Sequence, residues 1–168
     1  MNNALPKMLE APPALPVQIS VKDGKLVPEL MDDESQRQWL DRVKSALGIQ
    51  SDDLARYVLV TLFRSCRQPE ALKVNAMLAQ IAEGHPADAQ ETIMLTLMAA
   101  TSMRMQETFL QRENALDAED ALRKAKVIAQ YGRLYARQLE ALRRYRKTGD
   151  QRITVLRVDH ADAVAVAG

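Results

Sequence analysis

The chain has 168 residues, 47% of them hydrophobic, and is almost neutral because 23 lysines and arginines oppose 22 aspartates and glutamates. One cysteine excludes an internal disulfide, and two histidines leave too few ligands for structural zinc and too few bases for most histidine-dependent catalysis. No apolar run reaches the roughly 18 residues of a membrane span. We therefore expect a cytoplasmic protein that is not an enzyme, has no membrane partner and needs no cofactor or metal.

The N-terminal region changes character at residue 17. Five of the seven prolines precede residue 30, and this composition predicts a flexible arm over residues 1–16. Apolar and polar residues then alternate, and Asp23-Gly24 is typical of a tight turn with positive φ angles. The pattern predicts a β-hairpin over residues 17–28. An isolated hairpin is marginally stable in water, so this one must pack on helices or pair with another strand.

Three short helices are predicted between residues 34 and 83, each with apolar residues three or four positions apart. We expect them at 34–47, 52–66 and 70–83. Their ends coincide with capping residues, because Gly48 and Gly84 follow the first and third helices and Ser51 precedes the second.

A long helical hairpin is the dominant predicted feature. Between residues 87 and 147 the only helix-breaking residue is Gly132, and the acidic run around residues 113–120 is where we expect the chain to turn. The two helices are placed at 87–113 and 117–147. Both carry an apolar stripe, and two such stripes joined by a short connection favour an antiparallel hairpin.

Alternation of apolar and polar residues resumes after Gly149 and predicts a strand over 151–158, followed by a tail over 159–168. The expected fold is therefore a mainly α helical bundle, a single domain over 17–158, with a β-hairpin at its start and a strand at its end. A lone strand leaves backbone groups unpaired, so it must pair with the N-terminal hairpin or with another copy. We expect a homo-oligomer joined through the apolar residues of the last helix and strand: Ile128, Tyr131, Tyr135, Leu142, Ile153 and Val155.

The near-neutral total conceals two segments of opposite charge. Residues 1–120 carry 12 basic and 18 acidic side chains, whereas residues 121–157 carry 11 basic and two acidic ones. A basic segment of this kind suits an anionic partner, although a solvated helix face and cations near a helix C-terminus explain it equally well. The residues predicted to contact nucleic acid are Arg137, Arg143, Arg144, Arg146, Lys147 and Arg152.

One segment resembles a known group of sequences. Residues 139–158 read LEALRRYRKTGDQRITVLRV. This resembles the pattern L-x-A-L-x-R-Y/H-R-x-x-G-x-Q-x-V/I-T-V-x-x-V of a family of small proteins of unassigned function found in proteobacteria and their mobile elements. The resemblance covers roughly residues 40–160 and implies a non-enzymatic accessory protein of a bacterial or phage genome. The tail departs from the histidine-rich endings common in that family, since only His160 is present.

Two functions follow from these features. In the first, copies assemble and bring their basic segments together to contact an acidic partner such as DNA, an architecture similar to that of the small subunit of phage DNA-packaging terminases. In the second, the chain is a protein-interaction adaptor or inhibitor that binds no nucleic acid and whose basic segment pairs with its own acidic part.

Overall fold

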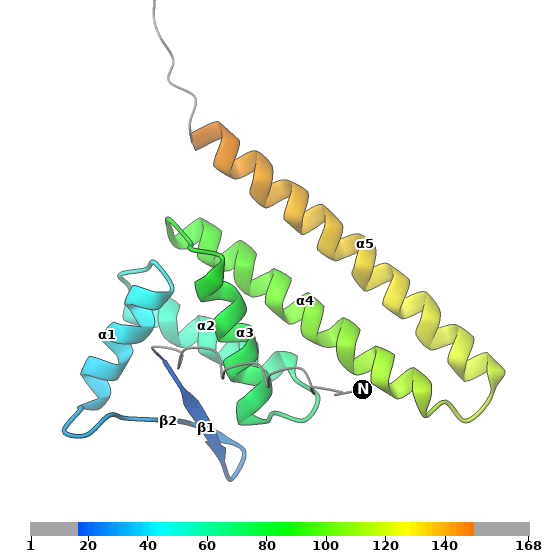
Figure 1. Cartoon of the computed structure of the whole chain (residues 1–168), viewed down its shortest axis with the longest axis horizontal. Helices are drawn as coiled ribbons and strands as arrows, with labels where there is room; N and C mark the ends of the chain where they lie inside the picture. The colour runs from blue at the N-terminus through cyan, green and yellow to red at the C-terminus, as the bar shows by residue number, and fades with distance from the viewer. Residues whose placement is uncertain (1–16, 150–168) are drawn as a thin grey trace, which may run out of the picture.

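Five helices follow a two-stranded β-hairpin in the computed structural model, which describes residues 17–149 (Figure 1). The elements are β1 (Ile19–Lys22), β2 (Lys25–Pro28), α1 (Gln36–Ala46), α2 (Asp52–Ser65), α3 (Ala71–Glu83), α4 (Ala89–Glu113) and α5 (Ala118–Gly149). The predicted mainly α fold and its order of elements are confirmed for this part of the chain. The arm at 1–16, the strand at 151–158 and the tail lie outside the described residues.

Capping residues set where the short helices begin. Helix α1 was expected from residue 34 but begins at Gln36, because Ser35 forms a capping box with Gln38. The Ser35 Oγ accepts the Gln38 N–H at 3.3 Å, and the Gln38 Oε1 accepts the Ser35 N–H at 2.8 Å. Helix α2 begins after Ser51 as predicted, and the Ser51 Oγ accepts the Leu54 N–H at 3.2 Å.

The β-hairpin has the predicted turn and packs on a helix. Asp23 and Gly24 adopt φ angles of 51° and 69°, and β1 pairs with β2 in antiparallel register. On the other edge of β1, the Asn75 side chain of α3 bonds both backbone groups of Ile19. The Ile19 N–H donates to Asn75 Oδ1 and Asn75 Nδ2 donates to the Ile19 carbonyl, each at 2.9 Å. The Asn75 amide thus takes the place of a neighbouring strand.

The hydrophobic core lies between α1, α2, α3 and α4. Each of these helices places a row of buried aliphatic or methionine side chains in it, and β1 adds Ile19. Fully buried members with large side chains include Leu47, Leu62, Met77 and Ile81. Burial of such side chains stabilises a fold by roughly 1.5–3 kcal/mol each, so these four helices form the stable body of the protein.

Helix α4 is central and α5 is peripheral. Helix α4 contacts α2 and α3 on one side and α5 on the other, and α5 runs antiparallel to it along the edge of the molecule (Figure 1). The predicted helical hairpin is therefore present, with its turn at residues 114–117. Among the described residues of α5, only Leu142 is a buried member of the core. Most of the other α5 side chains face solvent or pack on α4 alone.

The turn between α1 and α2 packs closely against the loop between α3 and α4. Gly48 has a φ of 64°, and a Cβ at this position would lie 2.2 Å from the Pro86 carbonyl oxygen. The buried Thr92 hydroxyl of α4 donates to the Leu47 carbonyl in the same turn. Gly48 is therefore required both by its backbone conformation and by the lack of space for a side chain.

Candidate nucleic-acid interface

Four basic residues form a line on the outward side of α5. Lys126, Arg133, Arg137 and Arg144 are separated by seven, four and seven positions and are all exposed. At about 100° of rotation per residue these spacings return to the same side of a helix. With a rise of 1.5 Å per residue, the line extends over roughly 27 Å. We call these four residues the basic stripe.

The basic stripe keeps an excess of positive charge. Among the described residues, no carboxylate pairs with Lys126, Arg133 or Arg137. Arg144 pairs with Glu140 one turn earlier, at 2.5 Å. Both side chains of that pair are more than half exposed, so the pair contributes little to stability and leaves the guanidinium accessible to a phosphate.

The predicted contact residues divide into two groups. Arg137, Arg143, Arg144 and Lys147 are exposed on α5, as a surface contact requires, whereas Arg152 lies outside the described residues. Arg146 points to the body of the protein instead. Its guanidinium donates to both carboxylate oxygens of Glu91, at 3.1 and 2.9 Å, and to the Gly84 carbonyl at 2.7 Å.

The Arg146 contacts hold the end of α5 on the loop between α3 and α4. Glu91 is only 4% exposed, and the guanidinium of Arg146 is the main cause of its lowered pKa. One residue earlier, the Tyr145 hydroxyl donates to Asp88 Oδ2 at 2.9 Å. That bond raises the pKa of Tyr145. The positions of the Arg146 and Tyr145 side chains are therefore explained by contacts within the chain.

The residues predicted to join copies lie on the opposite side of α5 from the basic stripe. Ile128, Tyr131 and Tyr135 are half-buried, and Tyr135 also accepts a hydrogen bond from Gln80 at 3.4 Å. Leu142 is 4% exposed and belongs to the core. Leu142 is thus used within one chain and offers no surface to a second copy, while Ile153 and Val155 lie outside the described residues.

Lys126 and Arg133 are functional candidates that the sequence prediction did not include. Their seven-residue spacing, together with Arg137 four positions later, was the available signal. The density of cations in the last turns of the helix pointed to residues 143–147 instead. The structure extends the basic surface beyond Arg137 by roughly three helical turns toward the α4–α5 connection.

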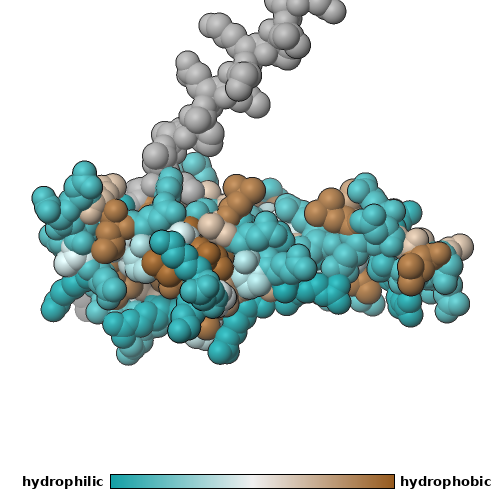
Figure 2. Space-filling view, turned by 90° about the horizontal axis from the view of Figure 1, so that it is seen from below, coloured by the Kyte–Doolittle hydropathy of each residue, from teal (hydrophilic) through white to brown (hydrophobic). Residues whose placement is uncertain are grey.

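On the face drawn in Figure 2, hydrophobic side chains form separate spots among hydrophilic ones. Within residues 17–149 no three metal-binding side chains are grouped as a site, and no helix combines the length and apolar character of a membrane span. Comparisons with protein-family models, curated proteins and solved structures gave no match.

Proposed function

We propose that the protein is a non-enzymatic, homo-oligomeric accessory protein of a bacterial or phage genome whose basic stripe binds the phosphate backbone of DNA. The observation that carries the proposal is the alignment of Lys126, Arg133, Arg137 and Arg144 on the exposed side of a long helix. Lysine and arginine side chains on one face bind successive phosphates without reading bases. The expected binding is therefore independent of DNA sequence and sensitive to salt.

Salt dependence tests the stripe directly. Neutralising four phosphates gives a slope of log K against log salt of roughly −3 to −4. A variant with all four stripe residues changed to Gln should lose most of this slope and bind a duplex oligonucleotide at least tenfold more weakly at low salt. Gln has nearly the helix propensity of Lys and Arg, so α5 is expected to persist. Fluorescence anisotropy at several salt concentrations gives both values.

A second variant controls for net charge. Arg37, Arg56, Arg64 and Arg112 are exposed on α1, α2 and α4, and changing these four to Gln removes the same charge from other surfaces. This control should retain the wild-type slope. Equal losses of DNA affinity in the two variants would show that only total charge matters. A wild-type chain that fails to bind DNA at low salt would exclude the DNA proposal.

Homo-oligomerisation is supported by large apolar side chains at the α4–α5 connection. Leu110, Leu116 and Leu122 are 59%, 95% and 57% exposed. Exposed leucines of this size are candidate contacts for a second copy. We expect light scattering to give a multiple of 18.8 kDa for the full chain. A chain ending at Lys147 and the Leu116→Gln, Leu122→Gln double variant should each give a lower mass. A full chain that scatters as a monomer contradicts this part of the proposal.

A protein-interaction adaptor is the second candidate. It is favoured by the bonds from Arg146 and Tyr145 to Glu91 and Asp88, because these pair the basic segment with the acidic part of the same chain. In this case the chain would fail to retain DNA at any salt concentration. The anisotropy measurement described above therefore distinguishes the two functions.

A further inference from the structure

A groove runs between the α2–α3 loop, the C-terminal half of α4 and the first turns of α5. It consists of three adjoining cavities of about 610, 310 and 540 Å³, all of which are lined by Arg67 and Gln111. These volumes lie within the range of small-molecule sites, roughly 300–1,000 Å³. We call this feature the Arg67 groove.

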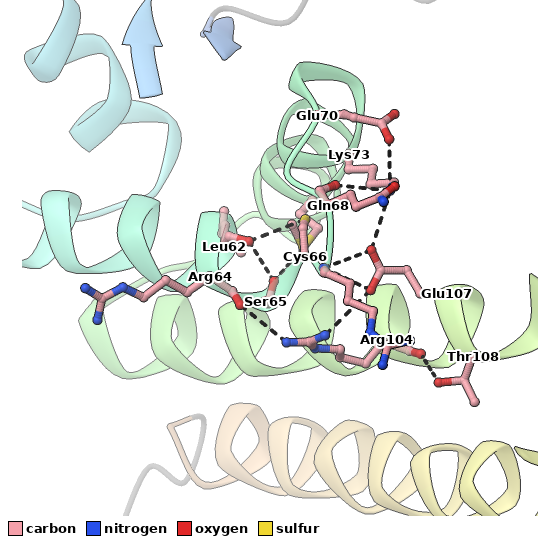
Figure 3. Close-up of polar contacts among 12 residues, drawn as sticks. Leu62, Arg64, Ser65, Cys66, Gln68, Glu70, Lys73, Arg104, Glu107 and Thr108 are labelled. Atoms are coloured by element: carbon pink, nitrogen blue, oxygen red, sulfur yellow. Dashed lines mark hydrogen bonds and ion pairs between the residues drawn. The ribbon is translucent and has the colours of Figure 1, made fainter. Parts of the chain in front are cut away.

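A buried carboxylate fixes Arg67 in the groove. Glu107 of α4 is 8% exposed, and its two oxygens accept the Arg67 backbone N–H at 3.1 and 3.2 Å. Figure 3 shows Glu107 directed at the α2–α3 loop, with Lys73 and Arg104 beside it at 3.5 and 3.7 Å. Glu107 binds the backbone N–H of Arg67 and not its guanidinium. The long Arg67 side chain is therefore available to line the groove.

The groove has more cationic donors than its own carboxylates can satisfy. Its lining contains five cations, Arg67, Lys73, Arg104, Arg123 and Lys124, and three carboxylates, Glu107, Asp117 and Asp120. Each carboxylate is already an acceptor within the chain, because Asp117 caps α5 at the Asp120 N–H and Asp120 binds both Lys124 and Arg123. Those two cations hold the pKa of Asp120 at about 2.

Arg67 is the donor that remains unused. Within the described part of the chain, no acceptor bonds the exposed Arg67 guanidinium. A guanidinium without a partner, surrounded by further cations, is suited to bidentate binding of a phosphate group. A metal cation would meet repulsion here, since the oxygens of the groove are occupied and its net charge is positive.

The apolar part of the lining indicates what is attached to the phosphate. Tyr131 and Val127 of α5 border the same cavity as Arg67 and Arg123. An aromatic ring next to cationic donors is the arrangement that binds a nucleobase by stacking and its phosphate by charge. At about 100° per residue, Arg123 lies roughly 60° around α5 from Lys126, whereas Tyr131 lies roughly 140° from it. The groove is therefore at the same end of α5 as Lys126 but on the side of the helix that faces α4, and Arg123 is its member nearest the basic stripe.

We propose that the Arg67 groove binds one nucleotide, with its phosphate on Arg67 and Arg123 and its base against Tyr131. The inference rests on the proposed function, since it adds a site for one nucleotide on another side of the helix that carries the basic stripe. The nucleotide is either free or the terminus of a strand, and both present the same phosphate and base.

Nuclear magnetic resonance of the full chain tests the site, because the Arg67 amide lies in the groove. Adenosine monophosphate, a 5′-phosphorylated single-stranded oligonucleotide and inorganic phosphate are added in turn, with adenosine as the uncharged comparison. We expect either nucleotide probe to shift the Arg67 amide in a saturable way and more tightly than phosphate alone. A shift by the oligonucleotide but not by the monophosphate identifies a strand terminus as the ligand, and the reverse identifies a free nucleotide.

Variants decide whether the groove itself binds. Arg67→Gln and Arg123→Gln should each weaken nucleotide binding at least tenfold, whereas Arg112→Gln, an exposed arginine of α4 outside the lining, should not. The proposal would be overturned if no phosphate probe changed the chemical shift of the Arg67 amide. It would also be overturned if adenosine and its monophosphate changed that shift equally. The four-residue stripe variant separates the two proposals, because it should lose duplex binding and still bind the nucleotide.

Discussion

At the scale of single residues, Arg146 shows why charge along a sequence does not reveal which cations are accessible. Its neighbours Arg143, Arg144 and Lys147 are exposed and carry the same charge, so residue type alone does not distinguish Arg146 from them. The distinguishing partner is Glu91, a buried carboxylate 55 positions earlier. Helical periodicity predicts that residue 146 faces inward with Leu139 and Leu142, but it does not predict an acid opposite it.

Removal of the Arg146 charge is expected to destabilise the protein in a pH-dependent way. The guanidinium lowers the pKa of Glu91, so its contribution to stability is present above the usual glutamate pKa and is lost as pH falls. In Arg146→Gln the buried carboxylate lacks its partner, and we expect a loss on the order of 2 kcal/mol at pH 7. The difference from wild type should narrow at an acidic pH below the lowered pKa of Glu91, where its carboxyl group is protonated. Urea unfolding of both chains at pH 7 and at the acidic pH measures this difference in the free energy of unfolding.

Arg144→Gln is the matched control for this measurement. Arg144 is two residues away and pairs with the exposed Glu140, so its replacement should change the free energy of unfolding by less than about 0.5 kcal/mol. If the difference in the free energy of unfolding between wild type and Arg146→Gln did not change with pH, the role assigned to Glu91 would be wrong.

At the scale of elements, most boundaries were predictable because they depend on local chemistry. Ser51, Gly84 and the Asp23-Gly24 turn were identified from residue type alone, and the structure confirms them. The role of Gly48 was only half predictable. Its position after α1 suggests a positive φ, but the contact with the Pro86 carbonyl depends on a loop 38 residues later.

Three Gly→Ala variants should separate these effects. Gly48→Ala combines a positive φ with a clash at 2.2 Å and is expected to cost more than about 2 kcal/mol. Gly24→Ala has a similar φ of 69° in open space and should cost about 1 kcal/mol. Gly132→Ala, in open space within α5, should stabilise by roughly 0.5–1 kcal/mol. Thermal denaturation ranks them, and a Gly48→Ala chain as stable as wild type would contradict the packing described here.

At the scale of the whole molecule, the sequence indicated which elements form but not how they are joined. Apolar periodicity predicted the α4–α5 hairpin because both stripes are local. It did not predict that α4 is shared between the core and α5, or that Asn75 would bond to β1 across 56 positions. The candidate interface shows the same limit, since the basic stripe follows from helical spacing, whereas the Arg67 groove requires three elements brought together.

The central place of α4 also affects the order in which the chain folds. Leu95, Met98 and Met103 of α4 are part of the core that α1, α2 and α3 surround, so a nascent chain synthesised only as far as Glu83 has an incomplete core. Stable folding during synthesis is therefore expected to wait until α4 has left the ribosome. Helix α5, with one buried core residue among those described, then docks onto a body that is already formed.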